Sequence, residues 1–155
     1  MPSTQPNIVL FFTDQLRADV LGCYGNQICK TPNIDRLATQ GVIFNNAYTT
    51  SPVCSPSRAS LMTGLYPHNH GVMLNTHISP AWSRGLSREV TVFSDILKDN
   101  GYRLDYAGKW HVHQDIPADE YGFDTYESLQ AILLKNKQAG REAGKLIQES
   151  GSFIE

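Results

Sequence analysis

The sequence has no long hydrophobic run and no excess of charge of one sign. Its longest apolar run, Ile8 to Phe12, is far shorter than the ~20 residues that a membrane-spanning helix needs. The N-terminus MPSTQPN lacks the basic and apolar regions of a signal peptide. The 13 basic residues are scattered and the net charge is -2, which argues against a nucleic acid or a membrane surface as the partner. As written, the chain is expected to be cytoplasmic.

Cysteine is also scarce. Cys23, Cys29 and Cys54 form no CxxC pair and are odd in number, so neither a disulfide framework nor a zinc knuckle is indicated. At least one thiol is therefore free. The 155 residues, 41% of them hydrophobic, suffice for one globular domain with a core.

The first half of the chain alternates strand and helix signals. The apolar segment 7–13 predicts a buried, parallel strand, and 42–48 predicts a second strand. Between them, Thr31 and Pro32 begin a short helix that Gly41 ends.

The same alternation continues in the second half. Ser55 is expected to cap a helix that ends at Gly64. The segment 89–101 predicts a helix capped by Thr91, with Phe93, Ile96 and Leu97 on one face. The segment 101–111 predicts a strand leading into a loop, and 126–149 predicts a longer helix. Strand and helix in alternation indicate an α/β fold.

Ligands bind beyond the carboxyl ends of the strands in open α/β sheets. Asp14 and Gln15 follow the first predicted strand, and Lys109, His111 and His113 follow a later one. If both strands are central, these residues and the turn at Cys54 would converge on one crevice.

Cys54 lies just before the predicted start of a helix, and Arg58 follows one turn later. Helix N-termini favour a thiolate or a bound anion, and an arginine adds a planar cationic group. The alternative is that Cys54 is a small buried hydrophobic residue. Only three residues separate Cys54 from Arg58, too few for the backbone to wrap a phosphate as a cysteine phosphatase loop does. Any nucleophile here is therefore of another kind.

Four ordered motifs resemble the sulfatase family. The stretch CSPSR, Cys54 to Arg58, followed by ASLMTGLYP, resembles the signature in which the cysteine is the precursor of formylglycine. The other three are NIVLFFTDQLRADVLGCYGN, TPNIDRLATQGVIFNNAY and GYRLDYAGKWH. The resemblance covers roughly residues 6 to 125. It implies an alkaline-phosphatase-like sandwich, in which a mixed, mostly parallel sheet lies between helices.

The resemblance also implies a modified nucleophile. A formylglycine-generating enzyme would oxidise Cys54 to an aldehyde, which hydrates to a geminal diol. One hydroxyl, made more acidic by a metal ion, attacks sulfur and displaces the alcohol. The second hydroxyl then loses its proton, the aldehyde reforms and sulfate leaves. A serine would be trapped as its sulfate ester.

The family's metal site maps onto Asp14, Gln15 and the modified Cys54. Carboxylate and amide oxygens suit a hard divalent cation, with calcium expected first and magnesium or manganese as alternatives. Gln15 stands where most relatives have a second aspartate, so the site has one negative charge fewer and is expected to bind metal less tightly. Glutamine also resembles the branch that hydrolyses phosphonate monoesters and phosphodiesters.

The remaining roles follow from the same resemblance. Arg58 would hold the diol, Lys109 would bind a sulfate oxygen, and His111 would be the base that triggers elimination. Asn75 lies where that phosphonate hydrolase branch has a substrate-contacting asparagine. No role is assigned to His113. The remaining loop histidines, His68, His70 and His77, are interpreted as loop residues rather than a ligand set.

Family members are usually several times longer than this chain and take further metal ligands from later segments. Residues 1–155 are therefore expected to be the N-terminal part of a sulfatase catalytic domain, a fragment with a half-built metal site. By itself it is expected to bind metal weakly and to hydrolyse sulfate esters poorly or not at all. Three functions stay open: hydrolysis of small-molecule sulfate esters, hydrolysis of phosphonates or phosphodiesters, and a non-catalytic remnant. Relatives often work in the periplasm or are secreted. The sequence makes no prediction of the oligomeric state.

Overall fold

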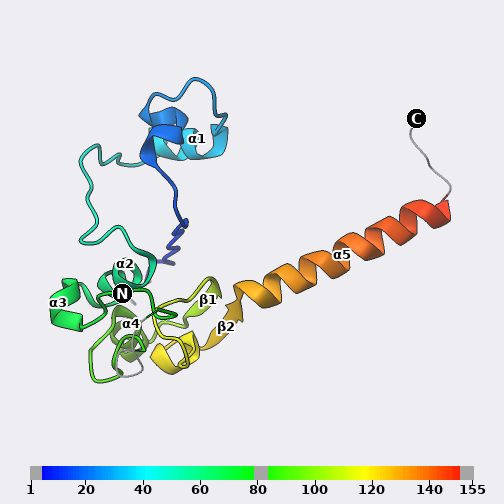
Figure 1. Cartoon of the computed structure of the whole chain (residues 1–155). Coiled ribbons are helices and arrows are strands. Elements are labelled where there is room, and N and C mark those ends of the chain that lie inside the picture. Colours follow the sequence, from blue (N-terminus) through cyan, green and yellow to red (C-terminus); the bar gives the residue numbers. More distant parts are fainter. Residues whose placement is uncertain (1–4, 79–83, 151–155) are drawn as a thin grey trace. The chain divides into compact units, whose positions relative to one another are not determined.

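The computed structural model describes residues 5–78 and 84–150, with side chains up to residue 140. The chain divides into two compact units, Met1–Tyr48 and Thr49–Glu155. Each unit is described by itself (Figure 1).

The first unit contains two short 3-10 helices, η1 (Ala18–Val20) and η2 (Gly22–Tyr24), and the helix α1 (Pro32–Gln40). Proline in the first turn and Gly41 after the last residue bound α1 as predicted. The Thr31 hydroxyl accepts the Gly22 N–H at 2.8 Å and donates to Asp35 at 3.0 Å. Thr31 therefore joins η2 to α1.

The two strands predicted in this unit are wrong. Residues 7–13 and 42–48 are irregular, and the first segment is exposed, with Val9 89% and Phe11 83% accessible. A strand is stable only when its N–H and C=O groups pair with a neighbour, and no described residue pairs with either segment. Their apolar composition predicts burial, but the described residues of this unit leave their apolar side chains exposed.

The second unit begins with α2 (Cys54–Thr63) and the short α3 (Pro67–His70). The predicted cap at Ser55 is wrong because the helix starts two residues earlier than that cap implies, at Cys54 with Val53 as its N-cap. Ser55 lies in the first turn and is completely buried. Gly64 ends α2 in the left-handed conformation, φ 69°, as the sequence predicts.

The third helix of this unit, α4, spans Phe93–Asp99, and Val92 rather than the predicted Thr91 is its N-cap. Phe93 and Leu97 pack against the core, whereas Ile96 is 54% exposed and does not share their face. Gly101, with φ 82°, ends the helix as expected.

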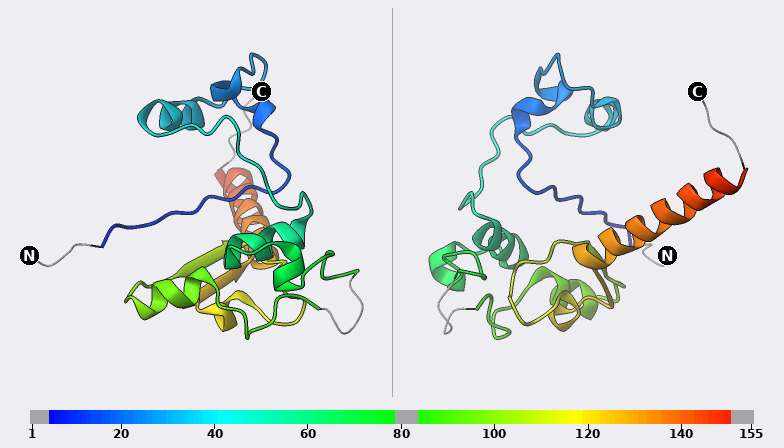
Figure 2. Two further views of the ribbon diagram at one scale, coloured as in Figure 1. Left: turned by 90° about the vertical axis from the view of Figure 1, so that its left-hand side faces the viewer. Right: turned by 45° about the vertical axis from the view of Figure 1, so that its right-hand side comes forward.

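The sheet consists of two parallel strands, β1 (Asp105–Gly108) and β2 (Thr125–Ser128), paired from Asp105 with Thr125 to Gly108 with Ser128. Figure 2 shows them side by side. The 3-10 helix η3 (Ala118–Tyr121) lies between them in sequence, and α5 (Leu129–Ser150) follows β2. The first three residues of the helix predicted from 126 are therefore strand. Their backbone pairs with β1, and this pairing outweighs their helical pattern.

Asp124 fixes the start of this pair of strands. Its carboxylate accepts the Leu104 N–H at 2.8 Å, and its own N–H donates to the Leu104 carbonyl. The hydrogen bond from the Leu104 N–H to the carboxylate, together with the hydrogen bond from Lys98, lowers the pKa of Asp124. Asp124 therefore fixes the register of β1 and β2 at the end of the strands that is opposite to the loop after β1.

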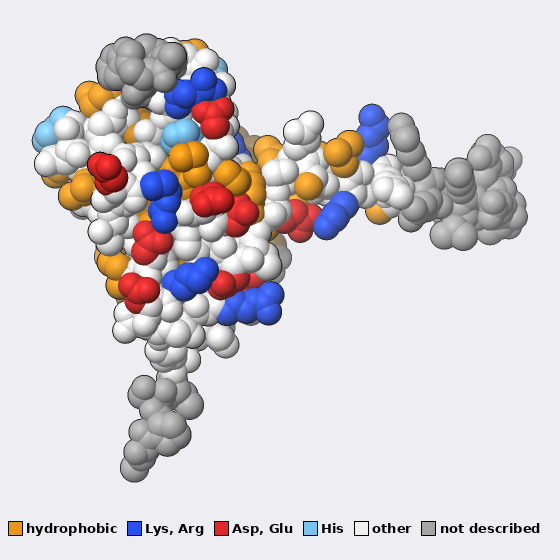
Figure 3. Space-filling model, turned by 90° about the horizontal axis from the view of Figure 1, so that it is seen from below, with side chains coloured by type: hydrophobic (Ala, Val, Ile, Leu, Met, Phe, Trp, Pro, Cys, Tyr) orange, Lys and Arg blue, Asp and Glu red, His pale blue; other side chains and the backbone are white. Residues whose placement is uncertain are grey.

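The second unit holds all the buried hydrophobic residues of the described chain. They are Ala59, Met62, Val72, Leu86, Val92, Leu104, Trp110, Val112, Ala118, Tyr121 and Phe123. Among the helices within the described residues, none has the length and apolarity required to cross a membrane. Figure 3 shows acidic and basic side chains interspersed on one face.

Candidate active site

The N-terminus of α2 places Cys54 beside Lys109. Cys54 is the first residue of the helix and is partly buried. The Lys109 ammonium lies 3.5 Å from the Cys54 sulfur, within hydrogen-bonding distance. Two residues 55 positions apart in sequence therefore meet, with a cation and a helix N-terminus both favouring negative charge at position 54.

Arg58 holds the backbone of Lys109. One turn into α2, its side chain is only 6% exposed, and its Nη1 donates to the Lys109 carbonyl at 2.7 Å. The Tyr106 hydroxyl donates to the same carbonyl at 2.6 Å. Burial raises the pKa of Tyr106, and the Arg58 charge partly opposes this increase. The Tyr106 hydroxyl therefore stays protonated and can donate. Arg58 and Tyr106 together fix where the loop leaves β1.

A turn at 75–78 is attached to the start of α2. Asn75 Oδ1 accepts the Ser55 N–H at 3.0 Å, and the Thr76 N–H donates to the Ser55 hydroxyl at 3.2 Å. The Ile78 N–H donates to the Asn75 carbonyl at 3.0 Å and closes the turn. The structure thus brings Asn75 to the residue after Cys54, and its contact with substrate stays a prediction.

His111 lies in the loop after β1 with a left-handed backbone, φ 54°. Its Nε2 is 3.1 Å from Nδ1 of His77 in the 75–78 turn. The loop is anchored just beyond it, because the Leu86 N–H donates to the Val112 carbonyl at 3.1 Å. Left-handed backbone is costly for a residue other than glycine and is concentrated at functional sites.

A pocket of about 490 Å³ adjoins these residues. It is lined by Thr76 and His77, by the loop after β1 including Lys109 and His111, and by the end of β2 with the start of α5. It therefore lies at the carboxyl ends of two parallel strands, where ligands bind in open α/β sheets.

Asp14 and Gln15 belong to the first unit. They form a turn after segment 7–13, and Gln15 has a left-handed φ of 56°. Cys54 belongs to the second unit, so a metal site that all three residues share stays a prediction. Among the described residues, no group of three or more His, Cys, Asp and Glu side chains is arranged to hold a metal ion.

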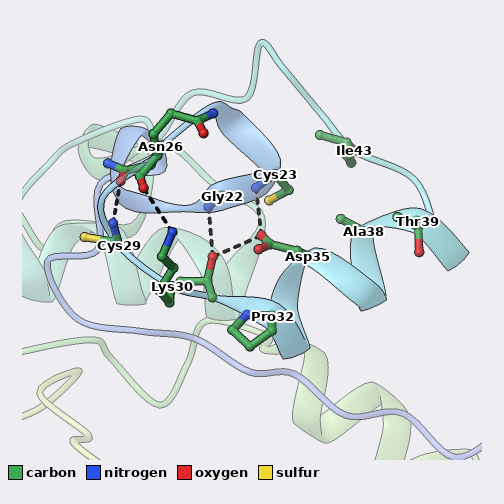
Figure 4. A pocket seen from close by; sticks show the side chains of 12 residues that line it. Gly22, Cys23, Asn26, Cys29, Lys30, Pro32, Asp35, Ala38, Thr39 and Ile43 are labelled. Atoms are coloured by element: carbon green, nitrogen blue, oxygen red, sulfur yellow. Dashed lines mark hydrogen bonds between the residues drawn. The ribbon is translucent and has the colours of Figure 1, made fainter.

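The first unit also has a pocket of its own, of about 610 Å³, between η2 and α1 (Figure 4). The Asp35 carboxylate accepts the Cys23 N–H at 2.7 Å, and an added Cβ at Gly22 would lie 2.4 Å from this carboxylate. The glycine is therefore required for η2 to approach α1. None of the predicted site residues lines this pocket.

Sequence reasoning missed two residues of the site, Tyr106 and His77. Tyr106 lies inside a strand, where an aromatic residue in the sequence indicates only that it packs against the core. His77 was interpreted as a loop residue, and nothing in its local sequence points to His111. Trp110 is buried, and its indole donates to the Ile116 carbonyl at 2.9 Å. The ring of His113 accepts two backbone N–H groups and so shapes the same loop.

Comparison with known proteins decides the family. The sulfatase family model matches residues 6–145. The chain belongs to the sulfatase family. It is 39% identical over 153 residues to arylsulfatase H of Canis lupus familiaris, covering 90% of this chain and 27% of the relative. It is 44% identical over 140 residues to the ulvan-active sulfatase of Formosa agariphila, covering 86% of this chain and 26% of the relative.

Solved structures agree with this assignment. The crystal structure of yidJ from Bacteroides fragilis matches with a TM-score of 0.63 and 37% identity, over 72% of this chain and 28% of that one. A 2-O GAG sulfatase matches with a TM-score of 0.63 and 32% identity, over 74% and 23%. The expected alkaline-phosphatase-like α/β fold class is confirmed. This sulfatase chain spans only about a quarter of the length of these relatives.

Proposed function

We propose that this chain carries the nucleophile of a metal-dependent sulfuric ester hydrolase. The observation that carries the proposal is the meeting of Cys54 with Lys109 at the N-terminus of α2, where the sulfur and the ammonium are 3.5 Å apart. A family member with a cation beside this position is arranged to hold a sulfate group next to its attacking atom. The substrate is a small-molecule sulfate ester.

The nucleophile is Cys54 after oxidation to formylglycine by a formylglycine-generating enzyme. One hydroxyl of the hydrated aldehyde loses its proton and forms a bond to sulfur. The bond from sulfur to the alcohol oxygen breaks, and that oxygen leaves with the electron pair and takes up a proton. The second hydroxyl then gives its proton to a base, the aldehyde reforms, and sulfate leaves with the electron pair of the C–O bond. This route regenerates the enzyme without an attack of water on sulfur.

Each neighbouring side chain has a role in this scheme. Lys109 offsets the charge of a sulfate oxygen. Arg58, which is buried and donates to the Lys109 carbonyl, keeps the lysine backbone in place and adds positive charge near position 54. His111 is the base for the elimination step, because an imidazole exchanges protons near neutral pH.

Asp14 and Gln15 fit a divalent cation by their donor chemistry. A carboxylate and an adjacent amide oxygen are the ligands that calcium, magnesium and manganese prefer, and the left-handed backbone at Gln15 is a conformation that binding sites retain despite its cost. When bound, the cation would make the attacking hydroxyl more acidic. Calcium takes more oxygens than these two, so the other ligands have to come from elsewhere.

The first test is the mass of the tryptic peptide 37–58, from protein made in its native host and then reduced and alkylated. We expect a peptide that resists alkylation and in which CHO replaces the CH2–SH group of Cys54. The Cys54→Ala protein is the matched control, because its peptide has neither group. A fully alkylated Cys54 would contradict the modification and favour the non-catalytic alternative.

A second candidate is hydrolysis of phosphonate monoesters or phosphodiesters on the same scaffold, which Gln15 favours. An amide in place of a second carboxylate lowers the negative charge of the metal site. Turnover of an aryl sulfate and the matching aryl phosphonate, measured on the same modified protein, separates the two. We expect the sulfate to react faster, and a Gln15→Asp variant should increase that preference.

The alcohol part of the substrate is not assigned. Among the relatives are steryl-sulfatases, arylsulfatases and an N-acetylgalactosamine-6-O-sulfatase, whose names describe different alcohols. The pocket beside Lys109 contributes polar and aromatic side chains that suit more than one of these.

A further inference from the structure

His77 and His111 share a hydrogen bond rather than a face-to-face stack. Their Nδ1 and Nε2 atoms are 3.1 Å apart, their planes differ by only 13°, and their ring centres are 5.2 Å apart. The centres are further apart than the nitrogens by roughly two ring radii, so the rings lie edge to edge. A nitrogen of one ring thus points at a nitrogen of the other.

The position of His77 is fixed by the start of α2. Its neighbours Asn75 and Thr76 bond to the N–H and the hydroxyl of Ser55, and Thr76 is only 2% exposed. His77 itself is exposed, so it does not serve the core. The 75–78 turn therefore connects the residue beside Cys54 to the edge of the His111 ring.

An N–H···N bond needs one donor and one acceptor, and this settles the tautomers as a pair. If Nε2–H of His111 donates to Nδ1 of His77, both neutral rings carry their proton on Nε2, the commoner tautomer. The opposite direction requires the less common tautomer in both rings. With the first arrangement, the buried Nδ1 of His111 keeps its lone pair.

We propose that His77 is a positioning residue that holds His111 in the Nε2–H tautomer, which makes Nδ1 of His111 the basic atom. The role of that atom as a base rests on the proposed function. When Nδ1 of His111 takes a proton, Nε2–H becomes a cationic donor and its bond to His77 strengthens. His77 thereby holds the ring in place and stabilises its protonated form.

The direct test is nitrogen-15 NMR of the histidine rings in the full chain at pH 8, where an unperturbed imidazole is neutral. In wild type we expect Nε2 of His111 to be protonated, Nδ1 to be unprotonated, and a coupling to connect Nε2 to Nδ1 of His77. His77→Phe should remove the coupling and let both His111 tautomers appear. His77→Asn should restore one tautomer, because the asparagine oxygen is as many bonds from Cβ as Nδ1 is.

The matched control is His68→Phe, since His68 is exposed and its ring lies against Tyr66, away from His111 in sequence. Its spectrum should keep the wild-type tautomer. A protonated Nδ1 in wild-type His111, or an unchanged His111 signal in His77→Phe, would overturn the proposal. Neither NMR result depends on whether Cys54 has been oxidised to formylglycine.

Turnover of an aryl sulfate by the formylglycine form adds a functional measurement. His77→Phe should lower kcat about tenfold with little change in KM, because the base and not the sulfate contact is affected, and His77→Asn should recover most of the loss. An unchanged kcat in His77→Phe would contradict the positioning role. An alkylated, unmodified Cys54 in the peptide 37–58 would make the proposed function fail, and the NMR result would still decide the tautomer.

Discussion

Removing the hydroxyl of Tyr121 should destabilise the protein at neutral pH and have no net effect at high pH. Tyr121 lies at the end of η3, is completely buried, and donates to the Leu86 carbonyl. Leu86 in turn donates its N–H to Val112, beside His111. In Tyr121→Phe the Leu86 carbonyl loses this donor, which costs about 1–2 kcal/mol.

The dependence on pH follows from the pKa of Tyr121. Burial raises it from 10.0 to about 12, although the nearby Arg88 charge opposes the shift. Between these values the folded protein keeps a proton that the unfolded chain releases, so the free energy of unfolding falls as the pH rises. At about 1.4 kcal/mol per unit, wild type loses roughly 1.4 kcal/mol by pH 11. The phenylalanine variant has no such loss, so the two proteins should become about equally stable.

The assay is urea unfolding followed by tryptophan fluorescence at pH 8 and pH 11, with Tyr66→Phe as the control. Tyr66 is 61% exposed, and its variant should parallel wild type at both values. Groups that titrate in both proteins, such as lysines, cancel in the difference. A gap between wild type and Tyr121→Phe that is the same at pH 8 and pH 11 would refute this reasoning.

Three further predictions concern single residues. Burial lowers the pKa of His70 from 6.5, so its contribution to stability is fully present above about pH 6.5 and is lost as the pH falls below it; the urea midpoints of wild type and His70→Gln should therefore converge as the pH falls from 8 to 5. Gly85→Ala would place a Cβ 2.4 Å from the His113 Cα at φ 149° and should lower Tm by several degrees, whereas Gly140→Ala, with no atom within 4 Å, should not. Asp14→Asn should weaken calcium binding measured by calorimetry, and equal heats in both proteins would argue against a ligand at this position.

Local signals in the sequence predicted the longer helices well, but not the short α3, where His68 and His70 were interpreted as loop residues. Proline in the first turn and glycine just past the end bound α1, and a left-handed Gly64 ends α2. These signals act through backbone sterics within a few residues, so no tertiary information is needed. The N-caps were predicted less well, because a serine side chain can cap a helix or bond elsewhere, and Ser55 bonds to the 75–78 turn instead.

The strands were harder because a strand needs a partner. The parallel pair β1 and β2 was predicted only in its first member, since Tyr126 to Ser128 continue without a break into a helical pattern. Segments 7–13 and 42–48 have strand composition and no ladder in the described residues. Composition reports what a segment would bury, and pairing decides whether it becomes a strand.

The site was predicted by resemblance more than by physics. Cys54 at a helix start was a weak signal alone, and only the family motifs selected Lys109 and His111. The structure adds the contacts that spacing does not contain: the 3.5 Å approach of Lys109 to Cys54, the bond from Arg58 to the Lys109 carbonyl, and the pair of His77 with His111. Each joins residues more than 30 positions apart, beyond the reach of local patterns.

Backbone strain provides an argument for the site that does not depend on family membership. Within residues 5–78 and 84–150, Gln15 and His111 are the non-glycine residues with positive φ, at 56° and 54°. Such a conformation costs of order 1–3 kcal/mol and persists only where its surroundings impose it. The resemblance had already selected both positions, one as a metal ligand and the other as a base. Two independent criteria, sequence motif and backbone strain, therefore point to the same two residues, one in each compact unit. If Gln15→Gly and His111→Gly both raise the free energy of unfolding while lowering turnover, the strain is maintained for function rather than for folding.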